Sequence, residues 1–553
     1  MSHQADLRNS PRERSDRTSP ELRGKVSRSP IPDRLRRPHG RHCEKGRGVS
    51  TPSQSNPHMS CKPRRFIFAG LTLACLYAVH LSYCQNSALP FLDAVFTESD
   101  MNANLRWAMS IKAQGWLNPV PYHPYTEWMH TIAPYTQWVQ WWGGEQIFQQ
   151  SPLYAYLLAL SPTNLIFARI MQGFMSAGVC VLLGLLTTRI AGRNAGWIAF
   201  WLAAFYAPFY AYSWPLLRDG LGWFITTALL LALVELTRSK WLSNSARRLA
   251  WIVGALLGLG YLARESYLIL IPMTCVVLGI IAWKRQGWDI LMRVGIAMIL
   301  TITPLILRNY FVGAPLLSSS NRFAEGFILG NSAGSHPYIF SIPKETSQIL
   351  YQTRGNTLPV IQATIASHHS VWGWVRLQSL KLLSLLDPYE SPDNLSFYFM
   401  ETISPIVRFG LRYWMILIPA LAGFVLSICR RERAHLWLWL FLPVILTSVL
   451  LGTPVSRYRQ SLAIFFVPWA ACFCSYFLGL IQQREIRGAS CWGIGLLLGW
   501  LLVLGPLARQ PRQRYERPAE YLLTAAIYQQ LGREKDSLQT QAEVQAKFKE
   551  GRR

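Results

Sequence analysis

The sequence predicts an all-α polytopic membrane protein, and three observations lead to that prediction. The chain of 553 residues is 51% hydrophobic and only 15% charged, whereas globular proteins average about 25% charged residues. Its apolar residues gather into runs close to the roughly 20 residues that a spanning helix needs. Its 22 tryptophans and 23 tyrosines are typical of chains whose rings lie at the membrane–water boundary.

The segment 1–64 differs from the rest of the chain, because it is rich in Ser, Pro and Arg and has little apolar periodicity. Such a composition predicts a disordered, basic cytoplasmic tail, solvated beside an anionic leaflet. A nucleic-acid arm is the alternative, but we expect no nucleic-acid partner. The stretch from Met59, "MSCKPRRFIFAGLTL", places a basic flank before a span, and we hypothesise that the natural chain begins there.

Eleven apolar runs between residues 65 and 508 are candidate spanning helices, and this range is the predicted membrane domain. They lie near 65–84, 165–189, 195–213, 217–237, 249–264, 266–283, 290–308, 404–428, 435–452, 460–481 and 490–508. The first run is long, has a basic flank and is followed by no Ala-x-Ala site, so we interpret it as an anchor and not as a cleaved signal.

Basic residues in the short loops predict the orientation of these spans. Five loops carry them: Arg189 and Arg193; Arg238, Lys240, Arg247 and Arg248; Lys284 and Arg285; Arg430, Arg431 and Arg433; Arg484 and Arg487. With eleven spans, all five loops and the N-terminus fall on one side, which the positive-inside rule assigns to the cytoplasm. We therefore expect a multi-pass membrane protein with a cytoplasmic N-terminus.

The opposite, extracytoplasmic side then receives two long outer loops, 85–164 and 309–403, and the tail 509–553. The tail reads as two short amphipathic helices around Leu531-Gly532. One hairpin cannot bury its own apolar face, so we expect it to pack on the outer loops or on a partner.

Carboxylates gather on the outer side, where they can act as general bases or hold a divalent metal. Asp93, Glu98 and Asp100 lie in the first outer loop, and Asp219 stands at the mouth of a span. A loop carboxylate is most often solvated, which we expect of Asp93. Asp100 precedes an amphipathic helical pattern, which makes it a better functional candidate; the alternative is that it merely caps that helix. Asp219 is harder to explain structurally, since an unpaired charge at a span entrance is costly, although Arg218 could pair with it.

Arginines also reach the outer helix ends, contrary to the positive-inside bias. Arg308, Arg457 and Arg459 lie there, and guanidinium groups suit phosphate because they donate two parallel bonds. Alternatively, Arg457 and Arg459 could snorkel to the interface. Acids and arginines together on the outer face favour chemistry on a lipid phosphate, with the lipid tail kept in the membrane. We expect His123 and His130 to be surface histidines, because their spacing matches no metal-ligand pattern.

Six stretches, in this order, give the chain a family resemblance over about residues 65–508: "PFLDAVFTESDMNANLRWAMSIKAQGW", "FQQSPLYAYLLAL", "LLRDGLGWFITTALLLAL", "GLGYLARESYLILIP", "RNYFVGAPLLSSSNRFAEGFILGNSAG" and "SRYRQSLAIFFVPWAA". The chain resembles the GT-C type, polyprenyl-phosphate-sugar-dependent glycosyltransferases, related to the protein O-mannosyltransferases and the lipid A aminoarabinose transferases. The fold implied is a GT-C-like helix bundle. The activity implied is transfer of a sugar from a polyprenyl-phosphate donor to a lipid, glycan or protein acceptor. The location implied is the inner (plasma) membrane, with the active site extracytoplasmic.

The resemblance also implies roles for particular residues. Asp100 matches the first-loop acid, the catalytic base, and Asp219 the second outer acid. Arg457 and Arg459, with Arg264 and Arg308 at other helix ends, are the expected donor phosphate-binding residues, while Asn321 and Asn331 belong to the expected substrate loop. The family's adjacent Asp-Glu is here Glu98-Ser99-Asp100, so Glu98 is a second candidate for the base.

Two other functions remain open at this point. A transporter or flippase of lipid-linked glycans would also span the membrane many times, but it often shows inverted repeats and charges near mid-membrane, which are not evident here. A lipid-carrier ligase or polymerase shares the loop and arginine pattern without needing both Asp100 and Asp219. The sequence decides neither the sugar nor the acceptor, and it leaves open whether a divalent metal takes part.

Overall fold

The computed structural model describes residues 64–161, 165–508 and 517–549. In that part of the chain all regular structure is helical, apart from one isolated bridge between Tyr206 and Leu411. The all-α class predicted from the sequence is therefore confirmed. The predicted tail 1–64, apart from Arg64, and the alternative start at Met59 lie outside the described residues.

Each of the eleven predicted spans coincides with a helix. These helices are α1 (Arg64–Gln85), α7 (Ile166–Ala191), α8 (Arg193–Ala204), α10 (Asp219–Arg238), α11 (Asn244–Ala263), α12 (Tyr267–Arg285), α13 (Trp288–Val312), α20 (Tyr413–Cys429), α21 (Leu436–Leu451), α22 (Ser456–Gln482) and α23 (Ile486–Leu504).

Eight of them, not eleven, are long and apolar enough in the described residues to be candidate spans: α7, α10, α11, α12, α13, α21, α22 and α23. Two of the others are short: α8 has 12 residues and α20 has 17. The predicted span 195–213 is interrupted because the chain turns at Phe205 and Tyr206 into the separate helix α9 (Ala207–Ala211). The protein is thus an all-α polytopic membrane protein whose helices differ in length.

Small residues bring several of these helices unusually close together, as is common between membrane helices. A Cβ atom added at Gly254 of α11 would lie 2.2 Å from the carbonyl oxygen of Val294 on α13. One added at Gly423 of α20 would lie 2.0 Å from the carbonyl oxygen of Trp469 on α22. A larger side chain at either position would push its helix pair apart.

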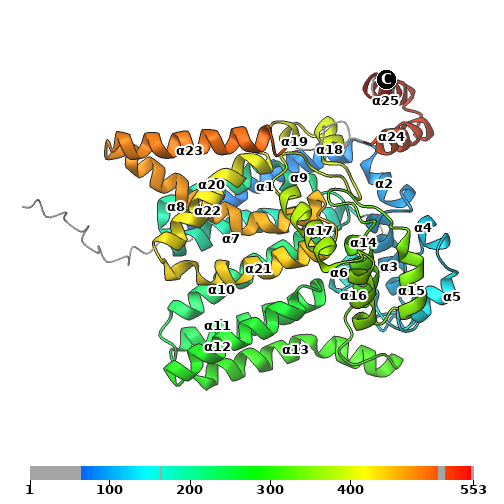
Figure 1. Ribbon diagram of the computed structural model, residues 1–553, viewed down its shortest axis with the longest axis horizontal. Helices are drawn as coiled ribbons and strands as arrows, with labels where there is room; N and C mark the ends of the chain where they lie inside the picture. The colour runs from blue at the N-terminus through cyan, green and yellow to red at the C-terminus, as the bar shows by residue number, and fades with distance from the viewer. Residues whose placement is uncertain (1–63, 162–164, 509–516, 550–553) are drawn as a thin grey trace, which may run out of the picture. The chain divides into compact units, whose positions relative to one another are not determined.

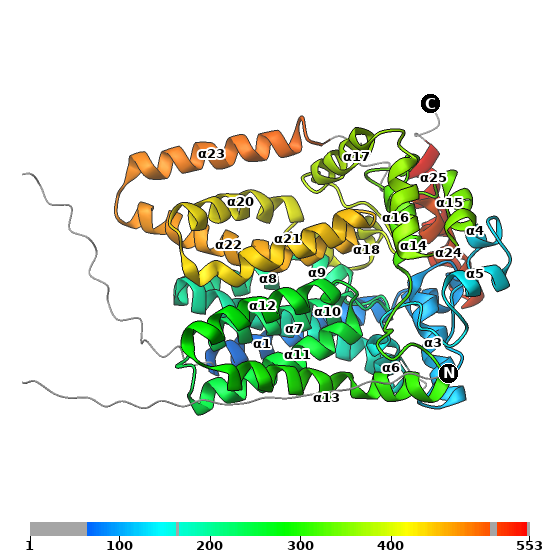
Figure 2. The ribbon, with the colours of Figure 1, turned by 60° about the horizontal axis from the view of Figure 1, so that its bottom comes forward.

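The shorter helices gather at one end of the long ones (Figures 1 and 2). Two connecting segments, which the sequence predicts to be outer loops, are called the first and second outer segments from here on. The first, between α1 and α7, forms α2 (Leu89–Val95), α3 (Asp100–Gln114), α4 (Glu127–His130), α5 (Tyr135–Trp141) and α6 (Leu153–Ala159). The second, between α13 and α20, forms α14 (Phe323–Asn331), α15 (Glu345–Thr353), α16 (Thr357–Ala366), α17 (Val371–Ser384), α18 (Phe397–Ile403) and α19 (Pro405–Phe409). A 3-10 turn, η1 (Arg433–His435), precedes α21.

The C-terminal hairpin consists of α24 (Pro518–Gln530) and α25 (Glu534–Lys549). It packs on outer-loop segments, as one of the two sequence-based alternatives predicted. Glu520 accepts a hydrogen bond of 2.9 Å from the backbone amide of Ser396, and Arg533 donates one of 2.9 Å to the carbonyl of Asn86.

Candidate active site

Arg457, the second residue of α22, is the centre of a cluster of charged side chains at the loop-bearing end of the long helices. Its Nη2 lies 2.8 Å from Oδ2 of Asp100 and 2.8 Å from Oδ2 of Asp393, and its Nε lies 3.6 Å from Oδ2 of Asp219. The Arg457 side chain is only 5% exposed. One guanidinium group therefore joins the first outer segment, the second outer segment and the start of α10.

Asp100 lies in the first turn of α3, but it does not cap that helix. The cap is Ser99, whose side chain accepts a hydrogen bond of 3.2 Å from the backbone N–H of Asn102. The backbone N–H of Asp100 donates to Oδ1 of Asn394 at 2.5 Å, and Nδ2 of Asn394 donates back to the Asp100 carboxylate at 3.1 Å. The Asp100 carboxylate is thus held toward the cluster while its side chain stays 22% exposed.

Two guanidinium groups set the ionisation of Asp100, because Nη1 of Arg322 also lies 3.3 Å from its Oδ1. Burial alone would raise the pKa of Asp100, but Arg457 and Arg322 outweigh burial and hold this pKa well below its usual value. The pKa of Arg322 is correspondingly raised: burial would lower it, but Glu325 and Asp100 prevail. Asp100 is therefore a carboxylate, able to accept hydrogen bonds, throughout the neutral range.

Asp219 is the first residue of α10 and is 1% exposed. It is ion-paired with Arg264, which follows the last residue of α11. This pair requires Gly222. A Cβ atom there would lie 2.6 Å from Nε of Arg264, which is too close for the arginine to keep its position. Buried in this way, Asp219 is placed to orient Arg264 and Arg457 and is poorly placed to meet a substrate.

A second ion pair adjoins this one. Arg218, just before α10, lies 2.7 Å from Glu265, which also accepts hydrogen bonds from the backbone N–H and the hydroxyl of Ser151 at 3.2 and 3.1 Å. Burial would raise the pKa of Glu265, but Arg218 and these hydrogen bonds lower it to about 2. The pair fixes the junction between α11 and α12 to the segment that leads into α6.

Several residues predicted for the site lie outside the Arg457 cluster. Glu98 is exposed and accepts a hydrogen bond of 3.0 Å from the backbone N–H of Glu127. Arg308 donates to the carbonyls of Leu117, Asn118 and Gln146 at 2.6–3.0 Å.

Three more of the predicted residues contact side chains or backbone outside the cluster. Arg459 pairs with Glu390 at 2.8 Å. Asn321 donates to the carbonyl of Trp142 at 2.5 Å, and Asn331 is buried and donates to the carbonyls of Phe327 and Leu451. The structure thus brings together Asp100, Asp219, Arg264 and Arg457 and leaves these others apart.

Two structural expectations from the sequence are wrong. Asp93 is 2% exposed, not solvated, because Arg169 of α7 lies 2.5 Å from it and needs a buried counter-ion. His123 is buried, and its Nε2 lies 2.7 Å from the carbonyl of Ile147; His130 is exposed as expected. The alternative that Asp100 is no more than an N-cap is excluded, because Ser99 caps α3 with its shorter side chain.

Four residues that complete the site were not expected from the sequence: Arg322, Asp393, Asn394 and Glu265. Arg218 was expected as a possible partner of Asp219 but pairs with Glu265. A signal existed for Arg322, Asp393 and Glu265, since charged residues are scarce in this chain and these three lie in predicted outer loops or junctions. In the described residues, no three His, Cys, Asp or Glu side chains are arranged to hold a metal ion. Instead, Asp100, Asp219 and Asp393 each face an arginine.

Comparison with known proteins gives few matches. No family model and no curated protein sequence matches the chain. Solved structures of an archaeal oligosaccharyltransferase from Archaeoglobus fulgidus are similar in backbone. For AglB in complex with an inhibitory peptide and a dolichol-phosphate the identity is 14% and the TM-score 0.42; for the apo form they are 15% and 0.42. Each match covers 80% of this chain and 55% of the other, so this chain spans about half the length of the structures it resembles.

Proposed function

We propose that the protein is a membrane glycosyltransferase that moves a sugar from a polyprenyl-phosphate donor to an acceptor hydroxyl on the extracytoplasmic face. The observation that carries the proposal is the Arg457 cluster. There a partly exposed carboxylate, Asp100, touches two guanidinium groups at the end of spanning helices. A base and a phosphate site placed next to each other are what transfer from a lipid phosphate requires.

The donor phosphate binds to Arg457 and Arg322 in this proposal. Its tail stays between the helices while its sugar faces the outer segments. A phosphate on these arginines draws their charge away from Asp100, so the pKa of Asp100 rises from its low value. Donor binding thereby turns a carboxylate that is too weakly basic into a useful base.

The chemical step is a single displacement. Asp100 takes the proton of the acceptor hydroxyl, the hydroxyl oxygen bonds to the anomeric carbon, and the bond from that carbon to the phosphate oxygen breaks. The electron pair leaves on polyprenyl phosphate, whose growing charge Arg457 and Arg322 stabilise. The anomeric configuration inverts. Asp219 holds Arg457 and Arg264 in place, and Asp393 shares the charge of Arg457.

The test is transfer from a radiolabelled polyprenyl-phosphate sugar in proteoliposomes, with and without EDTA. Wild type should move label to an acceptor, and Asp100→Asn should not. Asp289→Asn is the matched control, because Asp289 also faces two arginines, Arg247 and Arg293, but lies at the basic-loop end of the helices. If wild type instead moves labelled lipid between leaflets and labels no acceptor, the protein is a transporter and the proposal fails.

A further inference from the structure

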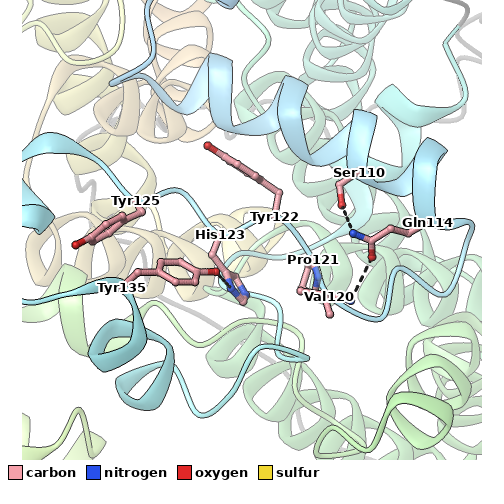
Figure 3. A pocket seen from close by; sticks show the side chains of 8 residues that line it. All are labelled: Ser110, Gln114, Val120, Pro121, Tyr122, His123, Tyr125 and Tyr135. Atoms are coloured by element: carbon pink, nitrogen blue, oxygen red, sulfur yellow. Dashed lines mark hydrogen bonds between the residues drawn. The ribbon is translucent and has the colours of Figure 1, made fainter.

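A pocket of about 410 Å³ lies beside α3, lined by residues of the first outer segment and separate in its lining from the Arg457 cluster. Its lining residues are Ser110, Gln114, Val120, Pro121, Tyr122, His123, Tyr125 and Tyr135. Figure 3 shows the three tyrosines and His123 on one side and Ser110 with Gln114 on the other. The volume falls within the range of roughly 300–1,000 Å³ that is usual for small-molecule sites.

The aromatic wall of this pocket is held in place before any ligand arrives. The ring of Tyr125 stacks on His130, with centroids 3.8 Å apart, and meets the edge of Tyr135 at 5.4 Å. The Tyr125 hydroxyl donates to the carbonyl of Ala133 at 2.9 Å. Rings fixed in this way lose little entropy when a ligand stacks on them.

His123 contributes an uncharged ring to the same wall. Its Nε2 donates to the carbonyl of Ile147 at 2.7 Å, which leaves Nδ1 to accept from the hydroxyl of Tyr135 at 3.4 Å. Burial lowers the pKa of His123, and the nearby Arg308 lowers it further, against the opposing effect of Ile147 and Glu145. The ring is therefore neutral at pH 7.

The chemistry of the lining favours a neutral, hydroxyl-rich ligand. None of the eight lining residues carries a carboxylate, ammonium or guanidinium group, so the wall itself favours an uncharged ligand over a phosphate or a charged peptide. Aromatic faces suit the C–H faces of a sugar ring, and the side chains of Ser110 and Gln114 suit its hydroxyl groups. Tyr122 belongs to this lining, and its hydroxyl has no hydrogen-bond partner among the described residues, so it is available to a ligand.

We infer that this pocket binds a neutral sugar unit of the acceptor, which makes the acceptor a glycan. The inference rests on the proposed function. Ser110 lies ten residues after Asp100 on α3, so at 1.5 Å per residue the pocket begins about 15 Å from the base. An acceptor chain lying along α3 therefore places one sugar in the pocket while its reactive hydroxyl, some units away, reaches Asp100.

The experiment is saturation-transfer NMR on the full chain in detergent micelles. The probes are neutral linear oligosaccharides of one to five hexoses, an oligomer of glucuronic acid and the tripeptide Ala-Ala-Ala. Tyr122→Ala/Tyr135→Ala removes two stacking faces and should weaken binding of the neutral oligosaccharides about tenfold. Tyr310→Ala is the matched control, because Tyr310 is 70% exposed and lies at the end of α13, outside the pocket. It should bind them as wild type does.

The inference fails if the neutral oligosaccharides bind wild type and Tyr122→Ala/Tyr135→Ala equally, or if the anionic oligomer or the peptide binds better than they do. Circular dichroism and elution volume show whether the double variant is folded. If it is not, Tyr122→Phe, which removes only the hydroxyl, must still weaken binding measurably for the inference to stand. Asp100→Asn should bind oligosaccharide normally, so this result separates the pocket from the proposed transfer reaction.

Discussion

Arg457 and Arg459 lie two residues apart on α22, yet their surroundings differ in kind. Helix geometry turns their side chains about 200° apart. Arg457 meets the carboxylates of Asp100 and Asp393, which are 22% and 20% exposed. Arg459 meets Glu390, with both side chains 3% exposed, and also donates to the carbonyls of Asp387 and Tyr389 at 2.6 and 2.9 Å.

The two surroundings predict different roles for two arginines at the same end of α22. Around Arg459 the tyrosine ring of Tyr413 covers the guanidinium at 4.1 Å, and the side chains of Ser456 and Gln460 also bond to Glu390. This closed network holds the 387–390 segment on α22. Around Arg457, Asp219 is buried but Asp100 and Asp393 are partly exposed, so in the proposed function a substrate phosphate replaces these two. We call the contacts of Arg457 with Asp100 and Asp393, and of Arg322 with Asp100, the open network, and those of Arg459 with Glu390 the closed network. We expect mutations in the open network to lower activity and mutations in the closed network to lower stability.

The largest effect should come from Asp100→Asn in the open network. Loss of the general base should lower transfer by about 10²–10⁴-fold, measured with the radiolabelled donor in proteoliposomes. The melting temperature should change little, because Arg457 keeps Asp393 and Asp219 as partners. Near-normal turnover in this variant would mean that Glu98 or Asp393 is the base.

In the closed network, Arg459→Met should leave the carboxylate of Glu390 buried without its counter-ion. The free energy of unfolding should fall by about 3–5 kcal/mol, seen as a lower melting temperature in micelles. Glu390→Gln in the same chain should restore part of that loss. Transfer per folded molecule should stay close to wild type; a stable but inactive Arg459→Met would contradict the comparison.

Arg322→Ala sharpens the comparison, because Arg322 belongs to the open network and is 32% exposed. Loss of a hydrogen bond to a charged group should raise the KM for the donor roughly 10–100-fold. Arg322 lowers the pKa of Asp100, so its removal raises that pKa and moves the acidic limb of the pH–rate profile to higher pH. Arg354→Ala, a substitution of another outer-segment arginine outside both networks, should leave the KM and that limb unchanged.

The smallest effect concerns Lys381 of α17, which anchors the segment leading into α22. Its Nζ donates to the carbonyls of Leu450 and Gly452 at 2.7 and 2.8 Å. Burial lowers the pKa of Lys381 from 10.5 to about 7. Between these two values the unfolded chain binds more protons than the folded one, so stability should rise as pH increases from about 7 to 10.

A Lys381→Met variant isolates this contribution. Relative to wild type, it should lack about 1–3 kcal/mol of the stabilisation gained between pH 7 and pH 9, measured as melting temperatures at both values. If the melting temperatures of wild type and variant change with pH in the same way, Lys381 stays charged in the folded protein. The activity of the variant at pH 8 shows whether the start of α22, which carries Arg457 and Arg459, has moved.

The sequence predicted the helix class and eleven helical runs well, because apolar periodicity and loop charge act over long, uniform stretches. It pointed to Asp219 because a charge at a span mouth is costly without a reason, and to Asp100, Arg264 and Arg457 through the family resemblance. The structure brings these four side chains together, and their roles stay predictions. The sequence could not separate Arg457 from Arg459, because the difference lies in which loop folds back over each. For the same reason it missed Asn394, which contacts Asp100 across 294 residues of chain, and Asp393, which pairs with Arg457.

The contact between Arg457 and Asp100 joins residues that are 357 positions apart. At about 5–20 residues per second of synthesis, the first acid waits roughly 20–70 s for its arginine. During the last two thirds of that interval the acids of α3 and α10 are both made, while Arg457 is not yet synthesised. Chains that terminate before α22 therefore contain most of the helices but lack the arginine that joins these acids.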